Sequence, residues 1–459
     1  MKKGYITIFF ALIFMVLVSF ILSIFTGIKI NAYKLKAECA YSVASNAVLG
    51  EYHVDLLERY DLFYVDTSYR TGVPDYHQVE AHLWEYIEKN MDIPPVSAEI
   101  REIVLATDQG GIPYRKQISA YMPDKIGMSY IRELSDLFQT VSKEGYLKED
   151  LTVQNPWEKK WQDTLSQREN IPEKTWKEIQ KISPIEKSYS VRESFVLNQV
   201  AGEKTQLSNK NINNSDLVSN REVITGTGCK DELDLTDKIY FIGYLFEKFS
   251  YYTEEQNDRV LNYELEYLLG DGGSDYENLS VVAKKLITLR ECINLTYLLS
   301  DNERMVLVKE LSAALSLLIA SPELAPVFEA LIIGLWVYAE SLNDVKILFS
   351  GGNVPLIKAK ETWTTDLEGG LNLEMITNSF QNSNEDMGYR QYLEILLLFA
   401  KDEKITLRSM DLIEMNIREL AGNETFRMDG LAEDFLLNLV FEIPWFGSYQ
   451  IVRRFSYAL

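Results

Sequence analysis

The chain begins with a long run of apolar residues. Between Tyr5 and Ile28 there are 24 consecutive residues without a charged side chain, and most of them are Ile, Leu, Phe or Val. Lys2 and Lys3 precede the run and Lys29 follows it. At about 1.5 Å per residue, a helix of this length exceeds the ~30 Å hydrocarbon core of a bilayer. The pattern therefore predicts one transmembrane helix over residues 5–28.

The helical pattern continues beyond this run. From Lys29 to Gly50 there is no proline and no interior glycine, and small residues recur at spacings of three and four. This spacing predicts one continuous N-terminal helix of about 45 residues, with its outer half as a stalk. Small side chains allow close approach of another element. Two interpretations stay open, packing against a partner helix or docking onto the protein's own domain. The face consists of Ala37, Ala40, Ala44 and Ala47.

Strand patterns lie near both ends of the folded part. Apolar segments around Leu62 and Ile100 indicate strands, and the second ends at the turn sequence Asp108-Gln109-Gly110-Gly111. At the other end, residues 435–443 and 449–457 flank Pro444-Trp445-Phe446-Gly447 and predict a hairpin. Because a lone hairpin is marginally stable, we expect it to join the strands at Leu62 and Ile100 in one small antiparallel sheet beside the stalk.

The region between these strands has mainly helical patterns. Residues 144–230 are rich in charged and amide side chains and indicate a polar linker or insertion. Two apolar runs, 311–320 and 330–339, contain ten residues each, which is too short to cross a bilayer and normal for a buried helix. The expected helices are 238–251, 261–269, 279–299, 304–320, 324–342, 389–400 and 405–420.

Together these patterns predict an α+β fold that is mainly helical. It has a long N-terminal transmembrane and stalk helix, a small antiparallel sheet from both chain ends and a large inserted helical domain. The expected segments are a leader and transmembrane helix (1–28), a stalk helix (29–60), a small α/β module (61–143), the polar linker (144–230), a helical domain (231–420) and a C-terminal β-hairpin (421–459).

The charge distribution separates the N-terminal segment from the rest of the chain. The 459 residues have a formal net charge of −22. Residues 1–60 contain six Lys/Arg against four Asp/Glu, so they carry +2 and the remaining residues carry −24. An acidic body of this size repels nucleic acid, which argues against ordinary DNA or RNA binding.

The three cysteines do not form a recognisable framework. Cys39, Cys229 and Cys292 are odd in number and far apart, whereas disulfide frameworks and zinc sites need paired or clustered spacing. We expect Cys39 and Cys292 to be buried as small apolar residues. A bridge between Cys229 and Cys292 stays open.

Two interpretations of the leader are open. A secretory signal has a shorter apolar core and a small-x-small cleavage site, and this run has neither. The first interpretation is an uncleaved signal anchor with a cytoplasmic N-terminus, because a long following domain is translocated largely regardless of charge. The second is a prepilin leader, because Lys2-Lys3-Gly4 leads directly into a hydrophobic helix and cleavage after Gly4 would leave Tyr5 first. Pilins usually carry Glu at the fifth position after the cut, where this chain has Phe9.

The sequence contains no recognisable catalytic or cofactor motif. P-loop, G-x-S-x-G, H-E-x-x-H and C-x-x-C patterns are absent. His53, His77 and His82 are not spaced as metal ligands on one helix face. We therefore expect no metal, no cofactor and no enzymatic activity.

Several charged residues are embedded in apolar helical segments. Because a buried charge is tolerated only when it is paired, we expect them to converge on a buried polar network that fixes the register of the helices. A general acid–base role is the alternative interpretation. The set is Glu264, Glu266, Arg290, Glu291, Glu340 and Asp344.

A string of motifs spans nearly the whole chain. It consists of Lys3-Gly4-x-Ile6-Thr7, the segment 60–66, Tyr263-Glu264-x-Glu266-Tyr267, Arg290 with Asn294, and Trp336-x-x-x-Glu340-Ser341-x-x-Asp344 with Val354-Pro355. In these motifs the chain resembles an uncharacterised family of clostridial membrane proteins whose genes tend to lie among those for Tad/Flp (tight-adherence) pilus assembly.

The resemblance implies a single-pass, pseudopilin-like component, comparable in layout to the TadE and TadG proteins and without assigned catalytic residues. Its partners would be the membrane and either pilus or secretion components or a second copy through the N-terminal helix. A surface binding or sensory ectodomain and an extracytoplasmic enzyme are the competing classes.

Overall fold

The computed structural model describes residues 2–91, 95–143, 196–201, 207–367, 386–444 and 446–457. The chain divides into two units. Unit 1 comprises Met1–Tyr121, Arg221–Leu233 and Ile413–Leu459, and unit 2 comprises Met122–Asn220 and Asp234–Leu412. Most of the expected polar linker, residues 144–195 and 202–206, lies outside the described residues, as does Trp445 of the expected turn.

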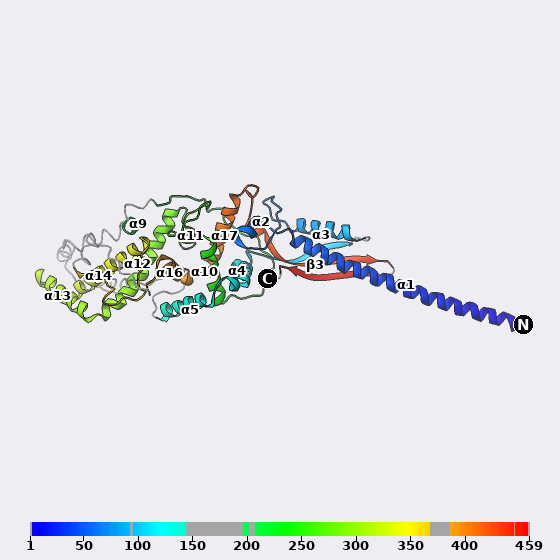
Figure 1. Ribbon diagram of the computed structural model, residues 1–459, viewed down its shortest axis with the longest axis horizontal. Helices are drawn as coiled ribbons and strands as arrows, with labels where there is room; N and C mark the ends of the chain where they lie inside the picture. The colour runs from blue at the N-terminus through cyan, green and yellow to red at the C-terminus, as the bar shows by residue number, and fades with distance from the viewer. Residues whose placement is uncertain are drawn as a thin grey trace. The chain divides into compact units, whose positions relative to one another are not determined.

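Unit 1 is built on one long helix. α1 (Lys2–Leu49) runs without interruption through the apolar run and the following small-residue segment, which confirms the continuous helix that the sequence predicts. Its 48 residues correspond to a length of about 72 Å. Within this unit, the N-terminal part of α1 extends past the sheet, and the C-terminal part lies along it (Figure 1).

Four strands form an antiparallel sheet from both ends of the chain, as the sequence predicts. The central strand, β3, pairs with the other three. The segment around Leu62 contributes only the two-residue strand Val65–Asp66. Asp61, in a left-handed conformation, ends the helix before this segment. The strands are β1 (Val65–Asp66), β2 (Ser97–Leu105), β3 (Leu431–Ile443) and β4 (Gly447–Ser456).

The core of unit 1 lies between the sheet, α1 and α3 (Tyr76–Asn90). Alternate residues of β3 enter this core, as the two-residue period of a strand requires. α3 contributes residues at helical spacing, and α2 (Val54–Tyr60) precedes β1. The core residues of β3 and α3 are Phe435, Leu437, Leu439, Phe441, Val79, Leu83 and Ile87.

The chain reverses sharply after β2, where a turn was expected. Gln109, Gly110 and Gly111 all have positive φ at the start of α4 (Asp108–Lys125). The carboxylate of Asp108 accepts hydrogen bonds from the backbone N–H groups of Leu105 (2.9 Å), Gly226 (2.6 Å) and Gly228 (3.0 Å). This one side chain therefore fastens the segment Arg221–Leu233 to the end of β2.

Unit 2 is helical over the residues that the structure describes. All seven helices expected from the sequence are present, with ends that differ by a few residues. Short 3-10 helices cover Pro322–Leu324 and Met428–Gly430, the second of them in unit 1. The α-helices are α5 (Met128–Lys143), α9 (Val196–Val200), α10 (Leu235–Lys248), α11 (Glu264–Gly270), α12 (Asp275–Ser300), α13 (Asn302–Leu318), α14 (Ala325–Phe349), α16 (Tyr389–Phe399) and α17 (Asp402–Arg418), whose last residues belong to unit 1.

α14 is the central helix of this unit. The stretch Pro322–Phe349 is long and apolar enough to cross a membrane, but 83% of its most apolar window is buried. α12 and α13 pack against it, and Trp336 and Phe328 lie in the core that they share. The expected burial holds for the run 330–339 in α14. It was wrong for the run 311–320, because α13 packs against α14 by one face only and leaves Leu317 and Leu318 67% and 80% exposed.

Candidate functional site

The first half of α1 presents an apolar surface on all sides. The side chains from Tyr5 to Phe25 are exposed, and the most apolar window of the helix has a mean hydropathy of 3.0 with 0% of it buried. A helix that is apolar all round is stable only inside a membrane or in a protein interior. This segment is therefore long and apolar enough to be a single membrane span or signal anchor.

The second half of α1 packs by its small-residue face. Ala37, Ala40 and Ala44 are fully buried in the core of unit 1, and Ala47 is half-buried. Small side chains at these positions let the helix backbone lie close to the sheet and to α3. The sequence left two possibilities for this face, packing against a partner helix or against the protein's own domain. In the structure it packs against its own domain. Gly4 and Tyr5, the possible cleavage junction, lie in the N-terminal part of the same helix.

Three of the embedded charged residues meet in unit 2. Arg290 of α12 donates from Nε to Oδ2 of Asp344 on α14 at 2.9 Å, and its Nη2 lies 2.8 Å from the same oxygen. Lys358, from the loop after α14, contacts both Oδ1 of Asp344 and Oε1 of Glu340 at 2.6 Å. All four side chains are buried. We call Arg290, Glu340, Asp344 and Lys358 the ionic network.

The remaining hydrogen-bonding groups of Arg290 are also satisfied. Its Nη1 donates to the carbonyl oxygens of Pro355 (3.0 Å) and Leu356 (2.9 Å) and to the hydroxyl of Tyr392 (2.8 Å). Its Nη2 donates to Oδ1 of Asn294 at 3.1 Å. Arg290 therefore connects α12 to α14, α16 and the loop after α14.

Glu340 is held in the same way from the loop side. Its carboxylate accepts hydrogen bonds from the backbone N–H groups of Thr364 (2.9 Å) and Thr365 (2.8 Å). Burial acts to raise the pKa of Asp344, but Arg290 and Lys358 outweigh it and hold that pKa below its ordinary value. Two carboxylates and two cations thus form a neutral, fully paired cluster, the arrangement in which buried charges are tolerated.

Glu264 and Glu266 of α11 lie elsewhere in unit 2. Glu264 accepts hydrogen bonds from the backbone N–H (2.8 Å) and hydroxyl (3.0 Å) of Ser250. Glu266 accepts from the hydroxyl of Tyr389 (2.6 Å) and the backbone N–H of Tyr252 (3.0 Å). Burial raises the pKa of Glu266 from 4.5 to about 7. These two residues are therefore held by their own partners and not by Arg290 or Lys358.

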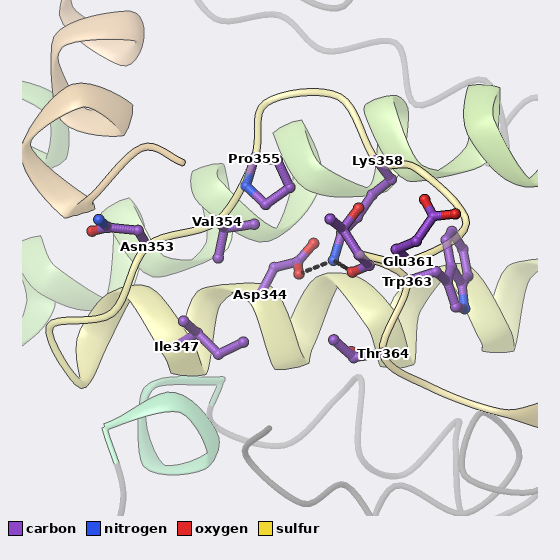
Figure 2. A pocket seen from close by; sticks show the side chains of 10 residues that line it. Asp344, Ile347, Asn353, Val354, Pro355, Lys358, Glu361, Trp363 and Thr364 are labelled. Carbon is purple, nitrogen blue, oxygen red and sulfur yellow. Dashed lines mark hydrogen bonds and ion pairs between the residues drawn. The ribbon is translucent and has the colours of Figure 1, made fainter. Parts of the chain in front are cut away.

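A small pocket opens beside the ionic network (Figure 2). Its volume is about 220 Å³, below the ~300 Å³ at which drug-sized ligand sites begin. In Figure 2 Lys358 reaches down from the loop toward Asp344, while Asn353 lies at one end and Trp363 at the other. Of the charged residues that line the pocket, Asp344 and Lys358 are already paired with each other, and Glu361 is exposed to solvent. It is suited to water or a small polar molecule.

Metal ligands are not gathered in the part of the chain that the structure describes, where no group of three or more His, Cys, Asp or Glu residues is placed to hold an ion. His53 caps α2 by accepting from the N–H of Leu56, and His82 lies 3.0 Å from Glu51.

The three cysteines are free thiols, so Cys229 and Cys292 do not pair. The expectation that Cys39 is buried was wrong: it is on the solvent side of α1, opposite the alanine face.

Lys358 was not anticipated from the sequence. It lies in a polar loop where helical or strand periodicity gives no guidance. A charge count would have indicated it, because Glu340 and Asp344 are one helical turn apart on a buried helix and Arg290 supplies only one compensating charge. A second cation was therefore required from another segment.

The comparisons with known proteins give one assignment. A model of a family of unknown function, DUF5702, matches residues 174–443, which is more than half of the chain. The chain belongs to this family. The DUF5702 match contains the whole ionic network, α11 and all of β3, whereas α1 precedes it. No curated protein and no solved structure matches the chain.

Proposed function

We propose that the protein is a membrane-anchored, pseudopilin-like structural or assembly component of a Tad/Flp-type pilus or a related secretion apparatus. Its N-terminus is cytoplasmic and the bulk of the chain is extracellular. The observation that carries the proposal is the continuity of α1. The first half of this helix is apolar and exposed, and the second half packs by one face against an antiparallel sheet.

Continuity of this helix has a mechanical consequence. A helix without a proline or hinge transmits position and orientation between its ends. Unit 1 is therefore fixed relative to the apolar half of α1, a coupling that suits a subunit of an ordered assembly. An enzyme tethered to a membrane needs no such coupling.

The proposed role is non-catalytic. The charged groups of the ionic network are engaged with each other and with backbone groups. A catalytic site needs a nucleophile, a base or an electrophile that is available to a substrate. Pairing of this kind supports a structural use of these residues.

The sequence resemblance supplies the link to pilus assembly, and it is tested by co-purification. The full-length protein is captured from solubilised membranes, and a matched control bait carries an unrelated single-pass helix in place of residues 1–28. Specific recovery of a pilus ATPase, an inner-membrane platform protein or a pilin supports the proposal. Recovery of none of these with the intact chain contradicts it.

Sequencing the mature N-terminus distinguishes the two forms of the anchor. A protein that begins at Tyr5 has been processed as a prepilin, and one that begins at Met1 is a signal anchor. Either result is compatible with assembly, but only the first adds a prepilin peptidase to the partners.

A surface binding or sensory ectodomain is the second candidate, and the pocket of about 220 Å³ beside Lys358 favours it. A small polar ligand bound there would raise the thermal midpoint of the native protein. Substitution of Asn353 by Leu would abolish this shift, whereas co-purification with pilus components would not be expected.

A further inference from the structure

The turn between β3 and β4 lies beside α1 at the point where the apolar run has ended. Nζ of Lys34 is 3.9 Å from the ring centroid of Phe446 and 5.3 Å from that of Tyr449. Lys34 follows Ile28 by six residues, which corresponds to about 9 Å along the helix axis. The turn is thus placed just outside the segment that is long enough to span a bilayer.

Contacts between β4 and α1 fix the orientation of the hairpin. The hydroxyl of Tyr449 donates to Oε1 of Glu38 at 2.7 Å, and Nη1 of Arg453 lies 2.6 Å from Oε2 of the same residue. Further along, the hydroxyl of Tyr457 donates to the carbonyl oxygen of Leu49 at 2.7 Å. Along α1 the contacts run from Lys34 through Glu38 to Leu49, and along the hairpin they run from Phe446 through Tyr449 to Tyr457. The end of the hairpin nearest Phe446 therefore points toward the apolar half of α1 (Figure 1).

Phe446, directly before β4, is fastened through its backbone but keeps its side chain partly exposed. The backbone N–H of Phe446 donates to the carbonyl oxygen of Ile443 at 3.0 Å, and Ile443 pairs with Gly447. Even so, 46% of Phe446 is exposed. A partly exposed aromatic ring next to a lysine is typical of a membrane interface, where aromatic rings lie at headgroup level and lysines extend their ammonium groups to the phosphates.

The dimensions agree with this location. The headgroup region adds about 5–8 Å to each side of the hydrocarbon core. Side chains of a helix lean toward its N-terminus, so Lys34 leans toward the bilayer from a backbone position about 9 Å above the core. Burial of α1 by its own domain also begins here, since Ile30, Tyr33 and Lys34 are half-buried whereas Ile28 is exposed.

We propose that Phe446, between β3 and β4, is a second membrane contact at the headgroup boundary of the bilayer that residues 5–28 span, with Lys34 beside the lipid phosphates. The proposal rests on the membrane anchor of the proposed function and deepens it. A helix alone can tilt and rotate in a bilayer. A second contact from the sheet restricts both motions and sets the orientation in which unit 1 leaves the membrane.

The test uses the full chain in vesicles of phosphatidylcholine and phosphatidylglycerol. Cys39 and Cys229 are replaced by Ser, buried Cys292 is kept, and an environment-sensitive fluorophore is attached at a new cysteine, F446C. The matched control is V452C on β4, a position of similar exposure (44%) in the strand that follows Phe446 but away from the end of the hairpin. A third site, L17C, reports on the span. Nitroxide lipids carry the quencher either near the headgroup or at the end of the acyl chain.

The expected result at F446C is a blue shift of emission on reconstitution and quenching by the headgroup-proximal nitroxide, with neither effect at V452C. L17C is expected to be quenched by the deep nitroxide. If L17C is quenched and F446C behaves like V452C, the proposed contact is wrong and the anchor stands. If L17C is not quenched, the anchor itself fails. If F446C is shielded without lipid quenching and cross-links to a second copy, the turn is a protein contact and the proposal is overturned.

Discussion

Nζ of Lys358 lies 2.6 Å from Oδ1 of Asp344, although the two residues come from a loop and a helix and only the helix has a pattern that sequence analysis can interpret. This pair closes the ionic network, because without Lys358 the carboxylates of Glu340 and Asp344 would share a single cation, Arg290. The loop after α14 is thereby part of the core of unit 2.

Substitution of Lys358 by Met should be strongly destabilising. The variant retains the apolar length of the side chain but leaves two buried carboxylates with incomplete compensation, which costs about 3–5 kcal/mol. The measurement is the urea midpoint of the solubilised protein. Lys360→Met is the matched control, because Lys360 pairs with Glu303 on the exposed surface, and it should leave the midpoint unchanged. Equal midpoints for the two variants would contradict the role assigned to the network.

Glu266 should make stability depend on pH. Its pKa is raised from 4.5 to about 7 by burial, and its Oε2 has no hydrogen-bond partner among the described residues. Between these values the folded state keeps a proton that the unfolded chain has released. The contribution of Glu266 is therefore fully present below pH 4.5 and is lost as the pH rises to about 7, a change of about 3 kcal/mol.

The check is the unfolding free energy at several pH values in this window. Glu266→Gln should reduce the decline of the unfolding free energy with rising pH, because the amide cannot ionise. Glu433 of β3 also has its pKa raised by burial to about 7, so the double variant with Glu433→Gln should flatten the decline of the unfolding free energy further. An unchanged slope in the double variant would show that neither carboxyl group titrates in this range.

The alanine face of α1 should tolerate no enlargement. Ala44 is completely buried between α1 and the rest of unit 1, and Ala44→Leu should lower stability by about 1–3 kcal/mol through overpacking. Ser42→Leu, on the exposed side of the same helix, is the control and should change little. Thermal unfolding of both variants measures the difference. If Ala44→Leu kept its stability but lost a binding partner, the face would be an intermolecular one.

Much of the fold could be predicted because it follows from local patterns. The uncharged run and the proline-free segment after it are sufficient to predict α1. Alternating residues such as Leu437 and Leu439 predict the hairpin. α12 begins at Asp275, before its apolar run, because the hydroxyl of Ser274 accepts from the N–H of Glu277 and caps the first turn. This Ser-x-x-Glu sequence is typical of the N-terminus of a helix.

The rest depends on contacts between distant segments. α14 continues to Phe349, past the expected end at residue 342, because the polar side chains that interrupt its apolar pattern are satisfied by the ionic network. Sequence analysis identifies Arg290, Glu340 and Asp344 as candidates for one network. It does not show that Glu264 and Glu266 lie outside this network and have their own partners. Nor does it place Lys358, whose position depends on the path of a loop.

The central claim, an extracytoplasmic body anchored by the first half of α1, is tested most directly by labelling Cys39 in intact cells. Cys39 is exposed on α1 and follows Ile28 by eleven residues, about 16 Å along the helix. With Cys229 replaced by Ser and Cys292 buried, it is the thiol that a reagent can reach. A membrane-impermeant maleimide added to intact cells should label this protein and not a cytoplasmic thiol protein. Labelling of Cys39 only after the membrane is disrupted would contradict the account.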